Sequence, residues 1–203
     1  MSIQATIFVD FHAMAAAVAS QVRARRSSAA SRVFGRSVIV VPTSHHGRWL
    51  ELELARRNDI ASGIDFVSIS VILRRAADEQ GGHLLNHELL RNTLVAVLID
   101  EAVTNQAGLE RVHSYLHAMP GDERALAVRA AGLAERLAAL YLEYDRNQPD
   151  WFTEWSSDDS WQASVWNLAQ ARLEGTVRPA AAANAVDSDL GLDALVIAGV
   201  RTL

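Results

Sequence analysis

The chain contains no cysteine and no lysine, and each absence excludes a class of chemistry. Without cysteine there are no disulfides, no thiolate metal ligands and no cysteine nucleophile, a composition typical of a reducing cytoplasm. Without lysine there is no Schiff-base chemistry, and all 19 basic residues are arginine. No apolar run reaches the roughly 18 residues that a membrane-spanning helix needs. Half of the 203 residues are hydrophobic, which is enough to bury the core of one domain or of a domain and a small satellite.

Charge is distributed unevenly along the chain. Residues 21–60 hold eight arginines against three acidic residues, whereas the remainder holds eleven arginines against twenty-one acidic residues. The net charge is therefore +5 in the first stretch and −10 elsewhere. A basic element on an acidic body indicates one face for phosphates and another for protein or solvent. The alternative is that arginine simply replaces lysine as the solubilising cation.

Residues 37–54 read as a buried strand, a polar turn and an amphipathic helix. Helicases and other nucleotide-hydrolysing enzymes hold ATP in this layout, but here the turn contains no Gly-x4-Gly-Lys-Ser/Thr motif. Pro42 also removes one of the backbone N–H groups that a phosphate-binding loop requires. The Asp158-Asp159 pair lies in a serine-rich loop, where it is badly placed to bind the metal of an ATPase. The chain itself is therefore predicted to be catalytically inactive and to bind no cofactor.

Apolar runs and helical spacings alternate along the chain. They predict strands at 3–9, 37–41, 64–69 and 194–200, and helices over 11–26, 46–57, 70–79, 84–103, 109–118, 123–144, from 149 and over 160–173. Residues 175–191 are predicted to be irregular. The order indicates an α/β fold class, a parallel sheet with a helical insertion. The expected division is 1–82 for the first part of the sheet domain, 83–175 for the helical subdomain and 176–203 for the return to the sheet. Because the chain stops just after the last predicted strand, we expect it to be the N-terminal fragment of a longer chain.

Two motifs follow one another along the chain. The first has Trp-Leu on the helix after the polar turn and then a Gly-Ile-Asp-Phe entry to a strand; it is carried by Trp49, Leu50, Ile60, Ile64, Asp65 and Phe66. The second is a Tyr…Tyr…Pro-Asp-Trp…Trp run with a later Trp-Gln…Trp, carried by Tyr141, Tyr144, Pro149, Asp150, Trp151, Trp155, Trp161, Gln162 and Trp166. Together, and in this order, they resemble the gamma subunit of exodeoxyribonuclease V, the RecC family.

The resemblance implies a fold like a superfamily-1 helicase domain that has lost ATP binding. It also implies a cytoplasmic, membrane-free subunit that works with the beta and alpha subunits of a helicase–nuclease in double-strand break repair by homologous recombination. In that family this region helps form a tunnel for single-stranded DNA from duplex ends and scans it for the Chi sequence. The matching DNA-binding positions in this chain are Ser44, Arg48, Ser68, Arg74 and Arg136. Their residue types differ from those of the better-known members, so we expect a different DNA sequence to be read, if any.

Several other residues carry both a functional and a structural interpretation. Arg48, Arg56 and Arg57 suit bidentate phosphate contacts and base stacking, or else form a solvated face with ion pairs. His45 and His46 are either donors to DNA or simply exposed. The tryptophans of 151–166 either stack on bases or, as we expect, pack a core between helices.

Two functions compete with DNA binding. One is a helical scaffold or adaptor that makes no DNA contact. The other is a metal-dependent hydrolase that uses the histidine pairs 83/87 and 113/117, whose i,i+4 spacing lets two imidazoles share a metal on one helix face. The second is disfavoured because no HExxH motif and no cysteine completes such a site.

Overall fold

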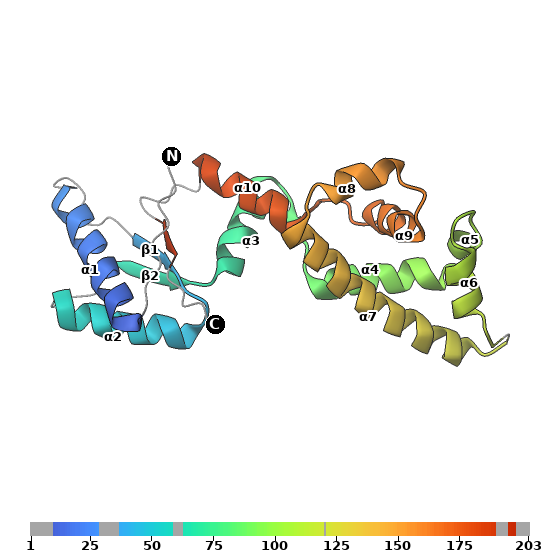
Figure 1. The fold of residues 1–203 in the computed structure, drawn as a ribbon, viewed down its shortest axis with the longest axis horizontal. Helices are drawn as coiled ribbons and strands as arrows, with labels where there is room; N and C mark the ends of the chain where they lie inside the picture. Colours follow the sequence, from blue (N-terminus) through green and yellow to red (C-terminus); the bar gives the residue numbers. More distant parts are fainter. Residues whose placement is uncertain (1–9, 29–36, 59–62, 120, 190–194, 198–203) are drawn as a thin grey trace. The chain divides into compact units, whose positions relative to one another are not determined.

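The computed structural model describes residues 10–28, 37–58, 63–119, 121–189 and 195–197 (Figure 1). The chain divides into two compact units. The first comprises residues 1–76 and 185–203, and the second comprises residues 77–184. In the described parts of the chain, no helix is both long enough and apolar enough to cross a membrane.

The first unit is built around a three-stranded parallel sheet in the order β2-β1-β5. The apolar run at β1 occupies the centre, with Ile39 paired to Phe66 of β2 on one side and to Val196 of β5 on the other. The elements of this unit are α1 (Phe11–Ser28), β1 (Ser37–Val40), α2 (Ser44–Asn58), β2 (Ile64–Val67), the start of α3 (Ile69–Glu79), the end of α10 (Pro179–Asp189) and β5 (Leu195–Ile197).

Both faces of the central strand β1 are covered, which explains why its sequence is continuously apolar. Ile39 and Val41 join the core formed with α1 and α2, whereas Val38 and Val40 join Ile72 of α3 on the opposite face. The helices accordingly lie on the two sides of the strands in Figure 1. Successive side chains of a strand point to opposite faces, so four consecutive apolar residues serve two cores.

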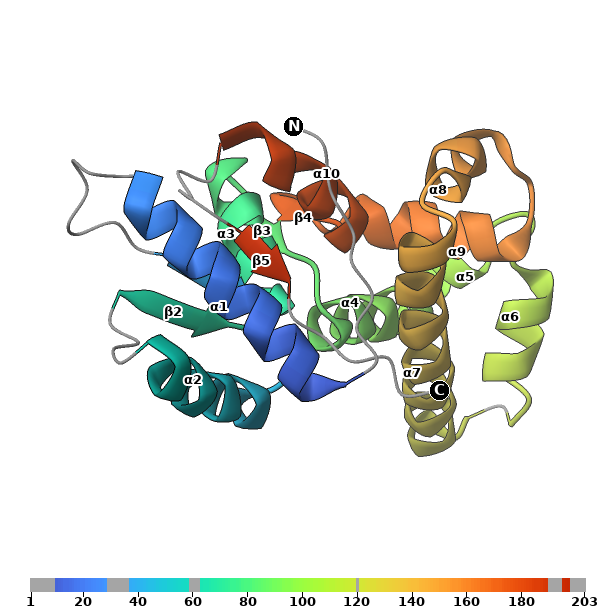
Figure 2. The same ribbon diagram turned by 60° about the vertical axis from the view of Figure 1, so that its left-hand side comes forward.

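The second unit is mainly helical, and α4 and α7 form its centre (Figure 2). Alanines 130, 134 and 138 of α7 are fully buried, and their small side chains let α4 approach closely. Around this pair lies one contiguous core to which Trp166 of α9 also belongs. The helices of this unit are α4 (His87–Ile99), α5 (Glu101–Thr104), α6 (Glu110–Leu116), α7 (Glu123–Asn147), α8 (Trp151–Glu154), a 3-10 turn η1 (Trp155–Ser157) and α9 (Trp161–Gln170).

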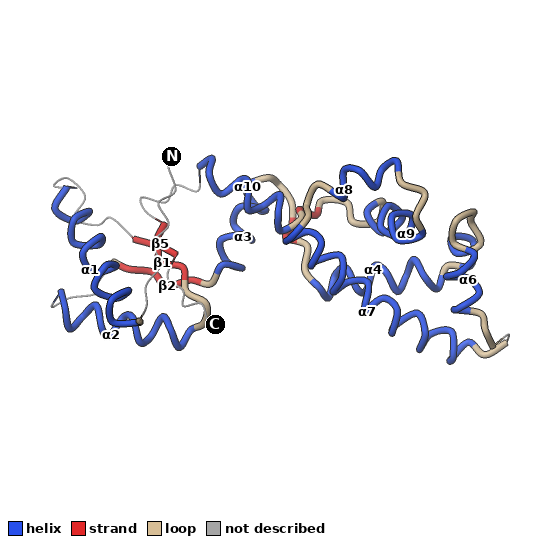
Figure 3. The backbone as a smooth tube through the Cα atoms, in the orientation of Figure 1, coloured by secondary structure: helices blue, strands red, loops and turns tan. Residues whose placement is uncertain are grey.

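Local sequence signals set the starts of the longer helices in this unit. Asn86, Asp122 and Ser160 each accept a hydrogen bond from the backbone N–H three residues later, at 2.9, 2.8 and 3.3 Å. A two-stranded parallel sheet, β3 (His83–Leu84) with β4 (Thr176–Val177), completes the unit and is drawn in red in Figure 3.

The fold class expected from the sequence, an α/β parallel sheet of a superfamily-1 helicase-like P-loop type, is wrong. Helices make up 71% of the described residues, and the sheets contain only three and two strands of two to four residues each. The β-branched runs are too short to build a dominant sheet. The alanine- and leucine-rich remainder instead buries helix against helix, as in the pairing of α4 with α7.

Most individual elements lie where periodicity predicts them, with three differences. The predicted helix 84–103 is divided, because Asp100 is extended between α4 and α5. Residues 175–191 were predicted to be irregular, which is wrong, because they form β4 and α10. The predicted strand 3–9 lies outside the described residues.

Candidate nucleic-acid interface

The turn after β1 is held by hydrogen bonds of its own. The N–H of Val41 donates to the carbonyl of Val67 at 2.8 Å, which extends the pairing of β1 with β2 into the turn. Thr43 then caps α2: its Oγ1 accepts from the His46 N–H at 3.3 Å and lies 2.7 Å from His46 Nδ1. An N–H group that a phosphate could have used is therefore occupied by a side chain of the chain itself.

Helix α2 lies unusually close to the sheet at Gly47. A Cβ atom added there would lie 3.2 Å from Cβ of Phe66 and 3.4 Å from Cγ2 of Val41. The absence of a side chain at Gly47 therefore lets α2 pack closely on the sheet. This close packing fixes the orientation of the exposed face of α2, which carries Ser44 and Arg48.

Ser44 and Ser68 follow neighbouring strands at the same edge of the sheet. Ser44 begins α2 after β1, and Ser68 comes directly after β2. The Ser68 hydroxyl lies 2.7 Å from the Ser70 hydroxyl, and Ser44 is exposed. Carboxyl ends of adjacent parallel strands share one edge, and ligands of open parallel sheets bind outside that edge. The structure therefore brings these two predicted residues to one place.

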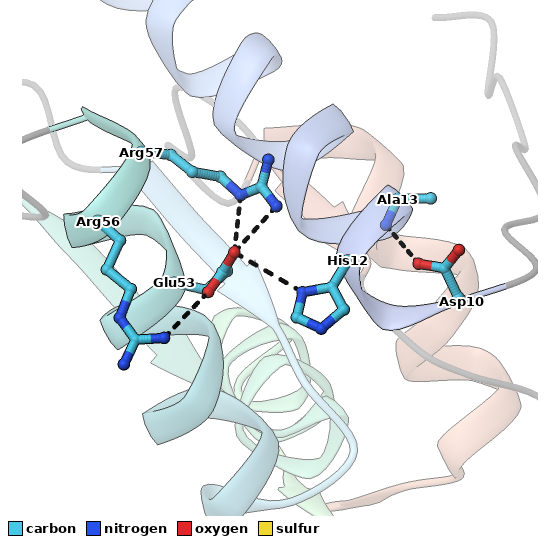
Figure 4. Close-up of polar contacts among 6 residues, drawn as sticks. All are labelled: Asp10, His12, Ala13, Glu53, Arg56 and Arg57. Atoms are coloured by element: carbon cyan, nitrogen blue, oxygen red, sulfur yellow. Dashed lines mark hydrogen bonds and ion pairs between the residues drawn. The ribbon is translucent and has the colours of Figure 1, made fainter.

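The arginines of α2 differ in their partners. Arg48 is largely exposed and binds Glu51 at 2.8 Å. Arg57 donates to Glu53 at 2.9 Å, and Arg56 lies 3.7 Å from the same carboxylate, as Figure 4 shows. His12 of α1 approaches Glu53 at 3.8 Å. Because Glu53 is only 8% exposed, Arg56 and Arg57 neutralise a buried carboxylate. The side chains of Arg48 and Arg56 are 70% and 79% exposed, whereas that of Arg57 is 33% exposed.

The ring of His46 packs against neighbouring aromatic side chains. Its ring stacks on Phe11 with centroids 5.7 Å apart, and Phe11 in turn meets the ring of Trp49 edge-on at 5.4 Å. Asp10 caps the start of α1 by accepting from the Ala13 N–H at 2.7 Å (Figure 4). His45 is exposed.

The two remaining predicted residues lie elsewhere. Arg74 is exposed in the second turn of α3, and Arg136 is exposed on α7 in the second unit. Neither forms a hydrogen bond or an ion pair with another residue that the structure describes. Both guanidinium groups are therefore available to an external acceptor.

Most of the tryptophan cluster belongs to the core. Trp155 and Trp166 are 8% and 2% exposed, and both meet the ring of Tyr141 edge-on at 5.7 and 5.3 Å. The Tyr141 hydroxyl donates to the carbonyl of Gln162 at 2.9 Å. Burial, and secondarily the neighbouring Tyr144, raises the pKa of Tyr141 above its ordinary value. Trp151 is 39% exposed and lies at the rim of the cluster.

The histidine pairs adopt other roles than a shared helical metal site. His83 lies in β3, so it shares no helix with His87, which approaches Glu135 at 3.5 Å. His113 and His117 stack on each other with ring centroids 4.3 Å apart. Over the described ranges, no three histidine, aspartate or glutamate side chains gather as metal ligands would.

Comparison with known proteins decides the family. The family model for the RecC N-terminal domain matches residues 12–189. The chain belongs to the RecC N-terminal domain family. Among curated proteins it is similar to the RecBCD enzyme subunit RecC of Mycolicibacterium smegmatis, with 23% identity over 145 residues. That match covers 70% of this chain and 13% of the relative's length.

The resemblance inferred from the two aromatic motifs is thereby confirmed. Within the RecC N-terminal domain, the second motif now has a structural meaning, because Tyr141, Trp155 and Trp166 pack against one another. Sequence reasoning did not single out Arg111 and Tyr115 of α6, which line a groove on the second unit together with Arg136 of α7. The i,i+4 spacing of Arg111 and Tyr115 was the available signal.

Proposed function

We propose that this chain is part of a non-catalytic RecC-type subunit that binds single-stranded DNA from duplex ends in the exodeoxyribonuclease V helicase–nuclease complex. The match of the RecC N-terminal domain to residues 12–189 carries this proposal. Its partners are the beta and alpha subunits of that complex, and its role is double-strand break repair by homologous recombination. We extend the proposal to the cytoplasm as the place of action, because bacterial DNA lies there.

The proposed contacts follow from the chemistry of the exposed side chains. Ser44 and Ser68 offer hydroxyl groups at the edge where β1 and β2 end. Arg48, Arg74 and Arg136 offer guanidinium groups, which bind phosphate through two parallel hydrogen bonds and stack on bases. Serine and arginine are not the residues of the better-known members at these positions, so the proposal does not extend to the Chi sequence.

The test uses the full-length protein, purified alone and with the beta and alpha subunits. Binding of an oligo-dT strand is measured at several salt concentrations, by fluorescence anisotropy. Each phosphate contact removed lowers the slope of log K against log salt by about 0.7 for a single strand. We therefore expect a lower slope for Arg74→Ala and an unchanged slope for Arg124→Ala, which removes another exposed arginine. Failure of the full-length protein to bind the strand or to co-purify with the subunits would refute the proposal.

One observation favours the competing scaffold function. Arg56 and Arg57, which lie in the basic stretch of the sequence, are engaged by Glu53. A scaffold would co-purify with the partner subunits while the salt dependence of DNA binding by the complex stayed the same in all arginine variants. The salt slopes therefore separate the two functions.

A further inference from the structure

A groove of about 370 Å³ opens on the second unit, where residues of α6, α7 and α9 meet. Helix α6 contributes Arg111 and Tyr115, helix α7 contributes Gly132 and Arg136, and α9 contributes Trp161 at its first turn. The volume lies in the range of small-molecule sites, which is roughly 300–1,000 Å³.

The geometry points to a nucleotide subsite: we propose that this groove binds one nucleotide of a single DNA strand, its base on Tyr115 and Trp161 and its phosphates on Arg111 and Arg136. The inference rests on the proposed DNA-binding function and gives it a definite location in the second unit. Proteins that bind single strands combine aromatic platforms with cationic groups that follow the backbone.

The two aromatic side chains of the groove differ in how far they are buried. Tyr115 is 50% exposed although its neighbour Leu116 is fully buried. Trp161 is partly buried against the core and lines the groove with its remaining surface. An exposed tyrosine beside a fixed tryptophan gives a base one adaptable and one rigid stacking surface.

The arginines of the groove are not neutralised by its walls. Arg111 and Arg136 make no hydrogen bond or ion pair within the described part of the chain, and no acidic residue lines the groove. The adjacent carboxylates have other partners: Glu110 accepts from the Gly108 N–H at 3.0 Å, and Glu135 binds Arg91 at 2.9 Å. An unneutralised pair of guanidinium groups beside apolar surface is suited to a phosphate group.

Gly132 keeps the groove open. It lies within α7, where glycine is unfavourable, and a Cβ added to it would meet no atom within 4 Å. The spacing of Gly132 and Arg136 places them on one face of α7, as that of Arg111 and Tyr115 does on α6. A larger residue at position 132 therefore enters the groove without displacing the core.

The experiment measures binding of an oligo-dT strand to the full-length protein in four variants. Gly132→Leu fills the groove, and Ala127→Leu is its control because it adds a leucine at an exposed position of the same helix outside the groove. Tyr115→Ala removes a stacking surface, and Tyr115→Phe restores it. We expect Gly132→Leu and Tyr115→Ala to weaken binding by about 5- to 100-fold, the equivalent of one lost stacking contact. We expect both controls to bind as the parent protein does.

Two further measurements identify the ligand. Arg111→Gln is expected to lower the salt slope by about 0.7, which a purely structural effect would not do. The mononucleotide dTMP is expected to compete only weakly, because it offers one base and one phosphate. If dTMP binds as tightly as the strand, the groove is a free-nucleotide site and the assignment to DNA is overturned.

Other outcomes separate this inference from the proposed function. If the parent protein binds the strand and Gly132→Leu and Tyr115→Ala bind equally well, the groove is refuted while DNA binding stands. If these variants instead lose the beta or alpha subunit and keep their affinity for DNA, the groove is a protein-docking site and the inference is wrong. If the parent protein does not bind the strand, both fail together.

Discussion

Asp145 is the most buried carboxylate within the described residues, with 3% of its side chain exposed. It accepts from Arg178 at 3.1 Å and from the Ala180 N–H at 2.8 Å. Arg178 also donates to the carbonyl of Pro149 at 3.3 Å and lies 4.9 Å from the centre of the Phe152 ring. The carboxylate therefore links α7 to the first turn of α10 and to the aromatic cluster.

We expect Asp145→Ala to destabilise the fold by about 3 kcal/mol or more, because it leaves the Arg178 guanidinium without its buried partner. Urea unfolding of this chain measures the loss, and hydrogen exchange of the Ala180 amide reports whether α10 frays first. Asp150→Ala is the control, because Asp150 is exposed and its side chain caps no helix. Equal stabilities of the two variants would contradict the role given to Asp145.

The buried hydroxyl of Tyr141 makes the stability of the fold depend on pH in the alkaline range. In the unfolded chain the hydroxyl ionises near its ordinary pKa of 10.0, whereas burial keeps it protonated to higher pH in the folded chain. As the pH rises past 10.0, the unfolded state binds fewer protons than the folded state. The free energy of unfolding therefore falls as the pH rises.

We expect this loss to reach up to about 1.4 kcal/mol per pH unit, and Tyr141→Phe to abolish it. The chain has no lysine and no cysteine, so few other side chains titrate in the same range. Unfolding free energies measured between pH 9 and pH 11, taken here as roughly one unit on either side of the ordinary tyrosine pKa, test the prediction. Tyr115→Phe is the control because Tyr115 is half exposed; a loss that persists in Tyr141→Phe would refute the assignment.

At the scale of elements, α10 shows why a helix can be missed from sequence. Pro179, the first residue of α10, is typical of a helix start. The residue before it is Arg178, however, and an arginine side chain cannot accept a hydrogen bond from the first backbone N–H groups of a helix. The side-chain acceptor for the Ala180 N–H is Asp145, 35 residues earlier in the chain. A cap supplied across the tertiary structure leaves no local pattern to read.

The small sheet β3–β4 depends on a close approach at Gly82. A Cβ atom there would lie 2.8 Å from Cγ2 of Val177 and 2.9 Å from the carbonyl oxygen of Gly175. We expect Gly82→Ala to destabilise the chain by about 1–3 kcal/mol, because the backbone oxygen cannot move aside cheaply.

The matched control for Gly82→Ala is Gly132→Ala, for which we expect a gain of roughly 0.5–1 kcal/mol. Gly132 lies inside α7, and alanine is the better helix former where the added Cβ meets no atom. Thermal unfolding of the two variants should therefore show a lower unfolding temperature for Gly82→Ala and a higher one for Gly132→Ala. The packing at Gly82 would be refuted if both substitutions stabilised the chain.

At the scale of the whole molecule, the basic stretch of the sequence is only partly available to an anionic ligand. Arg57 is bound to Glu53 and also accepts, through its carbonyl, a hydrogen bond from Arg23 at 3.1 Å. Arg74 and Arg136 have no such partners among the described residues. Counting the arginines of this stretch therefore overstates the number of guanidinium groups that an anionic ligand could bind.

We expect the protein to bind no nucleotide at the turn between β1 and α2. Pro42 has no N–H, Thr43 occupies the His46 N–H, and no lysine is present to reach a phosphate. Millimolar ATP with magnesium should therefore leave the unfolding temperature of the chain unchanged. A ligand at 100 times its Kd would stabilise the fold by about 2.7 kcal/mol, so binding at this turn would be readily detected.

Sequence alone determined the periodic helices, the central apolar strand and the family, because these depend on local spacing and on motifs in a fixed order. It did not determine the balance between sheet and helix, since strand length and partners depend on which segments pair. The cap of α10 by Asp145 and the groove beside Gly132 were decided by tertiary structure alone. Each of them joins groups from different helices, and no local pattern in a sequence records such a meeting.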